Sequence, residues 1–171
     1  MKHLTGEQIA EYWHRSFKTV DGLWFMKVES RYGFDTALDV DDEVWKVMPK
    51  IQARMLKSMC GMDSGITGLY EAMLMKLHLD GFTFDAARSN DGASFEMVIT
   101  ECPWHDVMVQ SGREHLSSKV GARICTSEYS VWAAQFGEGL SFELGDQICA
   151  GRPTCVLKFT SAPEADPSGM S

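Results

Sequence analysis

The sequence predicts an α+β fold: a helical N-terminal half, followed by two β-hairpins that form one antiparallel sheet with helices on one face. Up to about Asp80, apolar residues recur every three or four positions, which is the spacing of amphipathic helices. After Gly81 the apolar period becomes two, the spacing of strands. A helical stretch separates two such paired runs, and one sheet packed on helices is the most economical arrangement of these elements.

The chain length favours a single domain, because 171 residues can bury one sizeable hydrophobic core. We assign residues 1–160 to this domain. Residues 161–171 mix proline, serine, glycine and acids without an apolar period, so we expect a disordered tail there.

The N-terminal half begins with a helix start signal. Thr5 and Gln8 have the spacing of a capping box. Two apolar stripes follow at helical spacing, and the second one runs to Gly33, a residue well suited to end a helix. The sequence therefore predicts helical structure from Thr5 to Gly33.

Two further helical patterns lie between residues 36 and 80. The pattern of residues 36–59 contains Pro49, which marks either a kink or a fresh helix start. The pattern of residues 66–77 is the clearest in the chain and stops at Gly81. We expect helices in both regions.

Two hairpins are predicted in the second half. Residues 82–99 alternate around an Asp-Gly turn, and residues 140–159 alternate around a Gly-Arg-Pro turn. Pro103 suits the first turn of a helix, and the stretch up to residue 136 reads as helices broken near Gly112 and Gly121.

The charge and hydropathy of the chain exclude several classes of partner. The formal net charge is −8 and no basic run occurs, so nucleic acid is not an expected partner. No stretch approaches the roughly twenty apolar residues of a membrane span, and residues 1–7 lack the apolar region of a signal peptide. We therefore expect a cytoplasmic protein with no membrane partner, and a homodimer stays open.

The cysteines are the most informative residues for function. Their number is odd, five, in a chain without an export signal, which favours reduced thiols over a disulfide framework. Only Cys60 lies in the first half, and the others gather at predicted element ends: Cys102, Cys125, Cys149 and Cys155. This placement is not typical of cysteines that merely fill a core, and it predicts a shared site.

The segment Glu101-Cys102-Pro103-Trp104-His105 places a thiol at a strand-to-helix junction, with an imidazole on the same helix face three residues later. The positive end of a helix dipole lowers the pKa of a thiol and favours the thiolate, which is both a nucleophile and a metal ligand. We name Cys102, His105 and Glu101 as candidate catalytic residues.

Cys125 precedes a helical stretch and is expected at a second helix N-terminus. Cys149 and Cys155 flank the turn of the second hairpin, which would bring both sulfurs to one end of the sheet. Asp146 is a further candidate ligand, provided that a bulge or an early strand end turns it toward Cys149. The candidate metal ligands are Cys102, His105, Cys125, Asp146, Cys149 and Cys155.

Such a thiolate-rich set favours zinc, with an iron–sulfur cluster as the alternative. Even without Asp146, the five cysteine and histidine ligands exceed the four of a tetrahedral zinc, which leaves one of them as a candidate nucleophile. Arg113 and His115 could hold a carboxylate substrate, since arginine binds carboxylates in bidentate fashion. Aromatic residues complete the candidate substrate-binding set: Trp104, Tyr129 and Trp132.

Over most of positions 10–160 the chain resembles an uncharacterised prokaryotic family grouped with the L-2-amino-thiazoline-4-carboxylate hydrolase-like proteins. The residues that carry this resemblance are Val20 to Phe25, Glu101 to His105, Cys125, Tyr129 and Gly151 to Phe159. The resemblance implies hydrolytic opening of a cyclic amidine, a thiazoline ring. A thiolate or a metal-bound hydroxide would attack the amidine carbon while His105 moves the proton.

The final third is also similar to the vinyl-4-reductase domain, a small-molecule-binding module of phenol-sensing regulators. In that domain a cysteine, an acid, a second cysteine and a final cysteine hold zinc, and Cys125, Asp146, Cys149 and Cys155 fall in this order. The spacing of the last two cysteines and the Asp in place of Glu depart from the pattern. The sequence thus supports two readings, a small-molecule hydrolase and a metal-stabilised binding or sensor module.

Overall fold

The computed structural model of the chain describes residues 3–162. Its contacts divide the chain into two compact units, Met1–Val44 and Trp45–Ser171, which are described separately below. Most of the predicted tail, residues 163–171, lies outside the described residues, and Ser161 still belongs to a strand.

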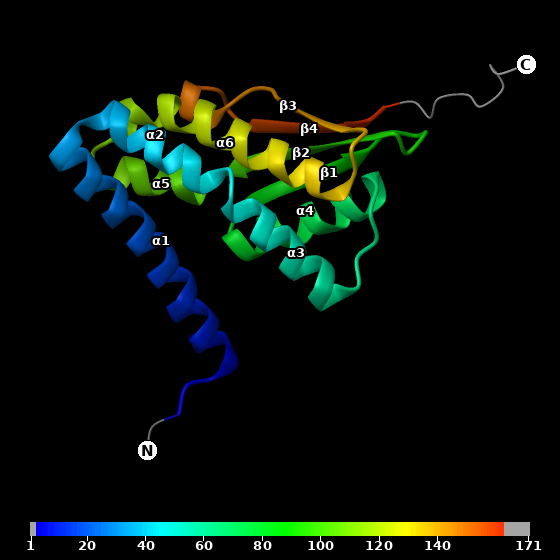
Figure 1. Cartoon of the computed structure of the whole chain (residues 1–171), viewed down its shortest axis with the longest axis horizontal. Helices are drawn as coiled ribbons and strands as arrows, with labels where there is room; N and C mark the ends of the chain where they lie inside the picture. Colours follow the sequence, from blue (N-terminus) through cyan, green and yellow to red (C-terminus); the bar gives the residue numbers. More distant parts are fainter. Residues whose placement is uncertain (1–2, 163–171) are drawn as a thin grey trace, which may run out of the picture. The chain divides into compact units, whose positions relative to one another are not determined.

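The first unit consists of two helices (Figure 1). The two predicted apolar stripes form one helix, α1 (Gly6–Tyr32), and α2 (Phe34–Trp45) follows at once. The predicted capping box is confirmed, since the backbone N–H of Gln8 donates to Thr5 Oγ1 and the N–H of Thr5 donates to Gln8 Oε1. Gly33 ends α1 with φ at 88°, a conformation that a side chain disfavours.

The second unit begins with α3 (Met48–Cys60) and α4 (Ile66–Asp80). Pro49 lies in the first turn of α3, so it marks a fresh helix start and not a kink. The predicted stop of the next helix is confirmed, because Gly81 adopts a left-handed conformation with φ at 83° after α4.

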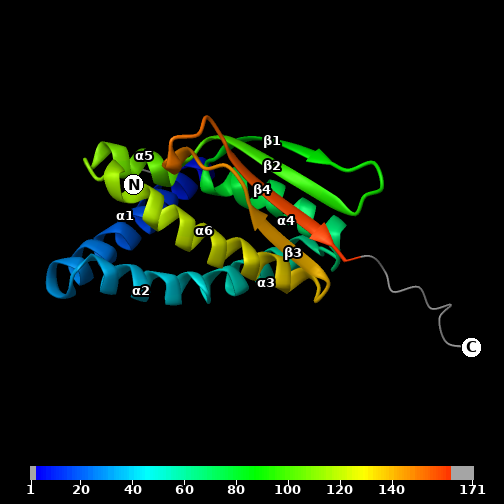
Figure 2. The same ribbon diagram turned by 90° about the horizontal axis from the view of Figure 1, so that it is seen from above.

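One antiparallel sheet contains all four strands of the described chain: β1 (Thr83–Arg88), β2 (Ser94–Glu101), β3 (Leu140–Leu144) and β4 (Cys155–Ser161). The strand order is β1-β2-β4-β3, so the two predicted hairpins pair through β2 and β4. In that pairing Ile99 lies opposite Cys155. Figure 2 shows α3, α4 and α6 on one face of this sheet, which confirms the predicted α+β architecture.

The helices between the hairpins are α5 (Pro103–Gln110) and α6 (Glu114–Phe136), and a short 3-10 helix, η1 (Ile148–Ala150), precedes β4. The predicted break near Gly112 is confirmed by its positive φ of 70°. The predicted break near Gly121 is wrong, because α6 continues through it. Glycine lowers helix stability by about 1 kcal/mol relative to alanine, a deficit that tertiary packing overrides here.

The core of the second unit lies between the sheet and the helices. Phe95 and Phe159 stack at 4.8 Å between ring centroids on the inner sheet face. The residues buried around them come from α4, α6, β2 and β4: Leu69, Met73, Leu77, Met97, Ile99, Tyr129, Trp132, Phe136 and Leu157. Within residues 3–162 we find no helix with the length and apolar character required to cross a membrane.

Candidate functional site: a cluster of four cysteines

Cys102 occupies the N-cap position of α5, as its place before Pro103 predicts. Burial raises the pKa of the Cys102 thiol to about 11, although the backbone amides of His105 and Trp104 act to lower it. The cost of desolvating the thiolate therefore outweighs its stabilisation by the amides of the helix terminus, and the prediction of a lowered pKa is wrong. Cys102 is a neutral thiol near neutral pH.

The sequence predicts Cys125 at a helix N-terminus, and this prediction is wrong. It sits in the middle of α6, because this helix continues through Gly121 and starts only at Glu114. Burial raises the pKa of the Cys125 thiol well above its usual range, and the carboxylate of Glu128 raises it further. No dipole is available there to stabilise a thiolate.

Cys149 and Cys155 lie on the two sides of the β3–β4 connection. Cys149 belongs to η1, and Cys155 is the first residue of β4, where its sulfur accepts a hydrogen bond from the backbone N–H of Ile148 at 3.2 Å. Burial raises the pKa of both thiols. The sulfur of Cys149 approaches the backbone of Gly121, where a Cβ would stand only 2.6 Å from it.

The four sulfurs lie close enough to affect one another's ionisation. A charge on Cys102, Cys149 or Cys155 raises the pKa of Cys125, and a charge on Cys102 raises that of Cys149. The four residues come from four elements: α5, α6, η1 and β4. They gather where β2 ends and β4 begins, and we call them the cysteine cluster.

The fit of a metal to this cluster depends on both chemistry and geometry. Four thiols are the donor set of many structural zinc and iron–sulfur sites. Over residues 3–162, however, no group of three or more His, Cys, Asp or Glu side chains stands in an arrangement that would hold a metal ion. The donor chemistry fits zinc, and the side chains would have to turn to reach ligand distances.

Asp146 takes part in a different interaction. β3 ends early, at Leu144, which meets the condition under which Asp146 and Cys149 could point to one site. The Asp146 carboxylate instead pairs with Arg152, with Oδ1 at 3.1 Å from Nε and Oδ2 at 3.4 Å from Nη2. Both side chains are about half exposed, so this pair lies at the surface.

His105 and Trp104 lie in the first turn of α5, next to Cys102. The Trp104 ring packs edge-to-face on Trp45 at 5.9 Å. His105 Nδ1 is buried and has no hydrogen-bond partner, which is rare for a polar atom in a folded protein. His105 Nδ1 is therefore available to form a hydrogen bond with a group that enters this place.

The other candidates lie in different surroundings. Glu101 is exposed, and its carboxylate accepts a hydrogen bond from Thr83 Oγ1 at 2.6 Å across the sheet. Arg113 and the exposed His115 are at the start of α6. Since a helix rises about 1.5 Å per residue, both lie roughly 15 Å or more along the axis from Cys125.

Tyr129 and Trp132 are core residues of α6, with 2% and 0% of their surface exposed. Burial raises the pKa of the Tyr129 hydroxyl well above its usual range. Trp132 Nε1 is buried without a hydrogen-bond partner. Tyr129 contacts Phe142 and Phe159 of the sheet, whereas the Trp132 ring stacks on Phe136 of the same helix.

One feature beside the cysteine cluster was missed from the sequence. Lys76 is only 3% exposed, and its Nζ contacts Asp80 Oδ2 at 2.6 Å and Glu128 Oε1 at 2.8 Å. Glu128 follows Cys125 by one helical turn, and Lys76 Nζ also lies 5.2 Å from the centroid of the Tyr129 ring. A lysine inside the apolar stripe of residues 66–77, four residues before an acid, was the available signal.

The sequence matches a known protein family over most of its length. A family profile described as "Family of unknown function (DUF6125)" matches residues 6–147, the greater part of the sequence. The chain belongs to this family. No curated protein matches the DUF6125 chain in sequence.

Two solved structures share the fold of this DUF6125 member. One is a trafficking protein particle complex subunit 3 from Naegleria fowleri, covalently bound to palmitic acid: TM-score 0.51, 10% identity, 90% of this chain and 95% of that chain covered. The other is the phenol-responsive sensory domain of the transcription activator PoxR, with phenol: TM-score 0.54, 11% identity, 86% of this chain and 75% of that chain covered. At such identities the likeness shows the fold alone.

The names of these matches include neither a thiazoline-carboxylate hydrolase nor a vinyl-4-reductase domain. Both resemblances drawn from the sequence therefore stay predictions. The DUF6125 family is the assignment that the comparisons support.

Proposed function

We propose that this DUF6125 member is a small-molecule-binding module in which Cys102, Cys125, Cys149 and Cys155 hold a structural zinc ion. The observation that carries the proposal is the gathering of four thiols from four elements, close enough that a charge on one raises the pKa of another. Thiolates so close to one another repel, and a divalent cation reverses that repulsion.

The four cysteines suffice for a closed tetrahedral site of the structural type. Asp146 is not required, in agreement with its surface pair with Arg152. Zinc bound there would link the start of α5 and the middle of α6 to both sides of the β3–β4 connection. An iron–sulfur cluster on the same residues is the alternative occupant.

Two features support binding of a small apolar molecule that carries one hydroxyl or carboxyl group. The two proteins of similar fold contain palmitic acid and phenol, which have this character. In the present chain, His105 Nδ1 and Trp132 Nε1 are buried polar atoms without partners. Ligand sites are mostly apolar and contain a few such polar groups that orient the ligand.

Hydrolysis of a cyclic amidine is a second candidate function, favoured by the unpartnered Nδ1 of His105 beside Cys102. His105 would take the thiol proton of Cys102 while the sulfur adds to the amidine carbon and the C=N electron pair moves to nitrogen, which His105 then protonates. Loss of the ring heteroatom and attack of water on the same carbon would release the opened product and the Cys102 thiol. Because the pKa of Cys102 is raised to about 11, few Cys102 thiols would ionise by themselves near neutral pH. The hydrolase hypothesis therefore requires His105 to remove the thiol proton.

The zinc proposal is tested by elemental analysis and an absorption spectrum of protein purified without oxygen or chelator. We expect about one zinc per chain. Replacing Cys102, Cys125, Cys149 or Cys155 by Ser, one at a time, should lower both zinc content and Tm. Cys60→Ser is the matched control, because Cys60 is an exposed thiol outside the cluster. Metal-free wild-type protein, with the four variants as stable as Cys60→Ser, would contradict the proposal.

Ligand binding is tested separately, by titrating tryptophan fluorescence with phenol and with a soluble fatty acid. We expect saturable binding that weakens in Trp132→Phe and His105→Ala. Turnover of 2-aminothiazoline-4-carboxylate that is lost in Cys102→Ser and His105→Ala would instead support the hydrolase reading.

A further inference from the structure

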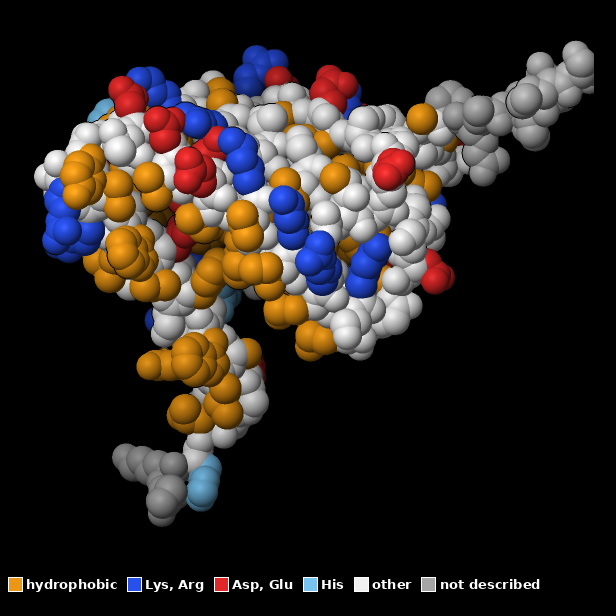
Figure 3. Space-filling model, viewed as in Figure 1, with side chains coloured by type: hydrophobic (Ala, Val, Ile, Leu, Met, Phe, Trp, Pro, Cys, Tyr) orange, Lys and Arg blue, Asp and Glu red, His pale blue; other side chains and the backbone are white. Residues whose placement is uncertain are grey.

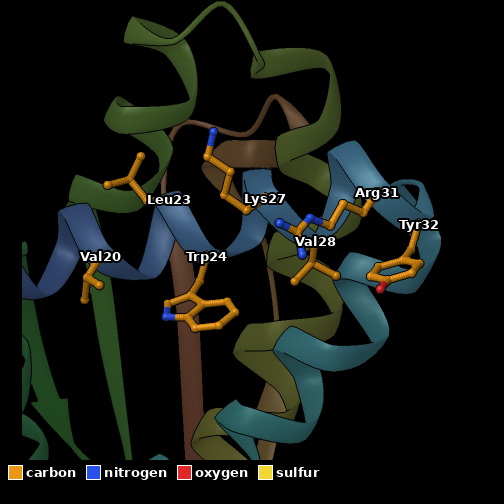
Figure 4. A pocket seen from close by; sticks show the side chains of 7 residues that line it. All are labelled: Val20, Leu23, Trp24, Lys27, Val28, Arg31 and Tyr32. Carbon is orange, nitrogen blue, oxygen red and sulfur yellow. The ribbon is translucent and has the colours of Figure 1, made fainter.

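The first unit exposes an apolar stripe along α1. Figure 4 shows seven neighbouring side chains of this helix that line a shallow groove: Val20, Leu23, Trp24, Lys27, Val28, Arg31 and Tyr32. Trp24 is 68% and Val20 51% exposed. Exposed apolar surface of this extent on one helix is typical of an interaction site.

The stripe continues toward the amino end of α1. Ile9 and Trp13 are 45% and 66% exposed, and Figure 3 shows hydrophobic side chains gathered over this part of the helix. The residues at successive steps of three or four lie on one side of a helix: Ile9, Trp13, Ser16, Val20, Trp24, Lys27 and Arg31. We call this set the α1 stripe.

The two halves of the α1 stripe differ in character. Both cations, Lys27 and Arg31, lie in the carboxyl half, whereas the amino half carries Ile9, Trp13 and the small Ser16. A cation is attracted to the face of an indole ring, and a small residue leaves room for a bulky one. The halves therefore complement each other.

We propose that the α1 stripe binds the α1 stripe of a second copy of this chain, as an antiparallel pair centred on Val20. Residues equally distant from Val20 then face one another, which places Lys27 against Trp13 and Trp24 against Ser16. Such a self-complementary contact has the two-fold symmetry of most homodimers. A parallel pair would instead place Lys27 beside Lys27 and Arg31 beside Arg31, which repel.

A tryptophan- and lysine-bearing helix can also lie on an anionic membrane. The net charge of −8 opposes that alternative, as do the acids Glu7, Glu11 and Asp21 on other sides of α1. In a second copy Lys27 meets the Trp13 ring and Arg31 meets Ile9, so neither cation of the stripe faces a like charge.

The first experiment measures the mass of the full chain by light scattering over a concentration series. We expect a dimer that dissociates on dilution, and Val20→Glu should weaken dimerisation about tenfold or more by burying a charge. Lys18→Glu is the matched control, a charge change on the opposite side of α1 from the stripe. A wild-type chain that stays monomeric at every concentration overturns the proposal, and binding of that monomer to anionic vesicles would favour the membrane.

The register is tested with opposite charges at one position. In the antiparallel pair Trp13→Glu meets Lys27 and retains the dimer, whereas Trp13→Lys meets Lys27 and breaks it. In a Cys60→Ser background, Val20→Cys should form a disulfide across the axis, and Arg15→Cys, on another side of α1, should not. Equal dimerisation of the Glu and Lys variants, or equal cross-linking of both cysteines, would exclude this geometry.

Discussion

The sulfur of Cys149 lies so near the backbone of Gly121 that a Cβ there would stand 2.6 Å from Sγ. Gly121 precedes Cys125 by one turn of α6, so both residues lie on the same side of the helix. Because Gly121 has no side chain, Cys149 can pack directly against the helix backbone there. This contact explains why a long helix retains a glycine in its interior.

Gly121→Ala should therefore destabilise the protein. Crowding against Cys149 is expected to lower the free energy of unfolding by about 1–3 kcal/mol, more than the 0.5–1 kcal/mol that alanine gains in a helix. Urea unfolding measures the change. Gly22→Ala in α1, where a Cβ meets nothing within 4 Å, is the control and should be neutral or stabilising. Gly121→Ala should cost less stability in a Cys149→Ala background than in the wild-type chain, and an equal cost in both backgrounds would place the strain elsewhere.

Lys76→Met should be among the most destabilising single changes in the second unit. It leaves the carboxylates of Glu128 and Asp80 without their buried cation, for an expected loss of about 3–5 kcal/mol. Lys158→Met removes the exposed Lys158–Glu96 pair and should change stability by at most about 1 kcal/mol. Similar effects of both changes on urea unfolding would argue against a structural role for the buried network.

The same network predicts a loss of stability at high pH. The carboxylates of Glu128 and Asp80 raise the pKa of Lys76 above its ordinary value, outweighing the effect of burial. The folded chain then retains the Lys76 proton at a pH where the unfolded chain, with a pKa near 10.4, has lost it. Stability should fall as the pH rises above about 10. Lys76→Met should show less of this fall in urea unfolding at successive pH values.

Thiol reactivity should follow the raised pKa values. Because only the thiolate reacts and the pKa of Cys102 is about 11, alkylation of metal-free protein near pH 8 should be about two orders of magnitude slower at Cys102 than at an ordinary thiol. Exposed Cys60 should react first. Peptide mass spectrometry of iodoacetamide adducts over time gives both rates. Rapid modification of Cys102 would indicate an activated thiolate and favour the hydrolase reading.

Asp21 should destabilise the protein at neutral pH. Burial raises the pKa of Asp21 to about 6, so between about pH 4 and 6 the folded chain binds this proton and the unfolded chain does not. The contribution of Asp21 to stability then falls as the pH rises through this window. Asp21→Asn should add about 1–2 kcal/mol at pH 7, allowing for partial exposure. Asp85→Asn, at an exposed strand position, is the control.

Local signals predicted most of the fold. The Thr5 capping box, the stop at Gly81 and the alternation of both hairpins each depend on neighbours in sequence, and the structure has all three. The break expected at Gly121 was wrong for a tertiary reason. The packing of Cys149 on α6 outweighs the weak helix propensity of glycine.

The candidate site was predicted only in part. The sequence identified the four cysteines and placed Cys102 at a helix start. It could not predict their pKa values, because desolvation depends on atoms from α5, α6 and β4 that meet only in the folded chain. It also assigned Asp146 to the cluster, whereas the β3–β4 connection turns its carboxylate to Arg152.

The sequence by itself thus determined the α+β class, the order of the elements and the residue types of the cysteine cluster, since periodicity, caps and turns are local properties. Only the tertiary structure decided that these thiols are neutral and that Lys76, Glu128 and Asp80 form a buried network beside them. Burial and charge at one point in space depend on which segments pack together, and sequence spacing does not encode this directly.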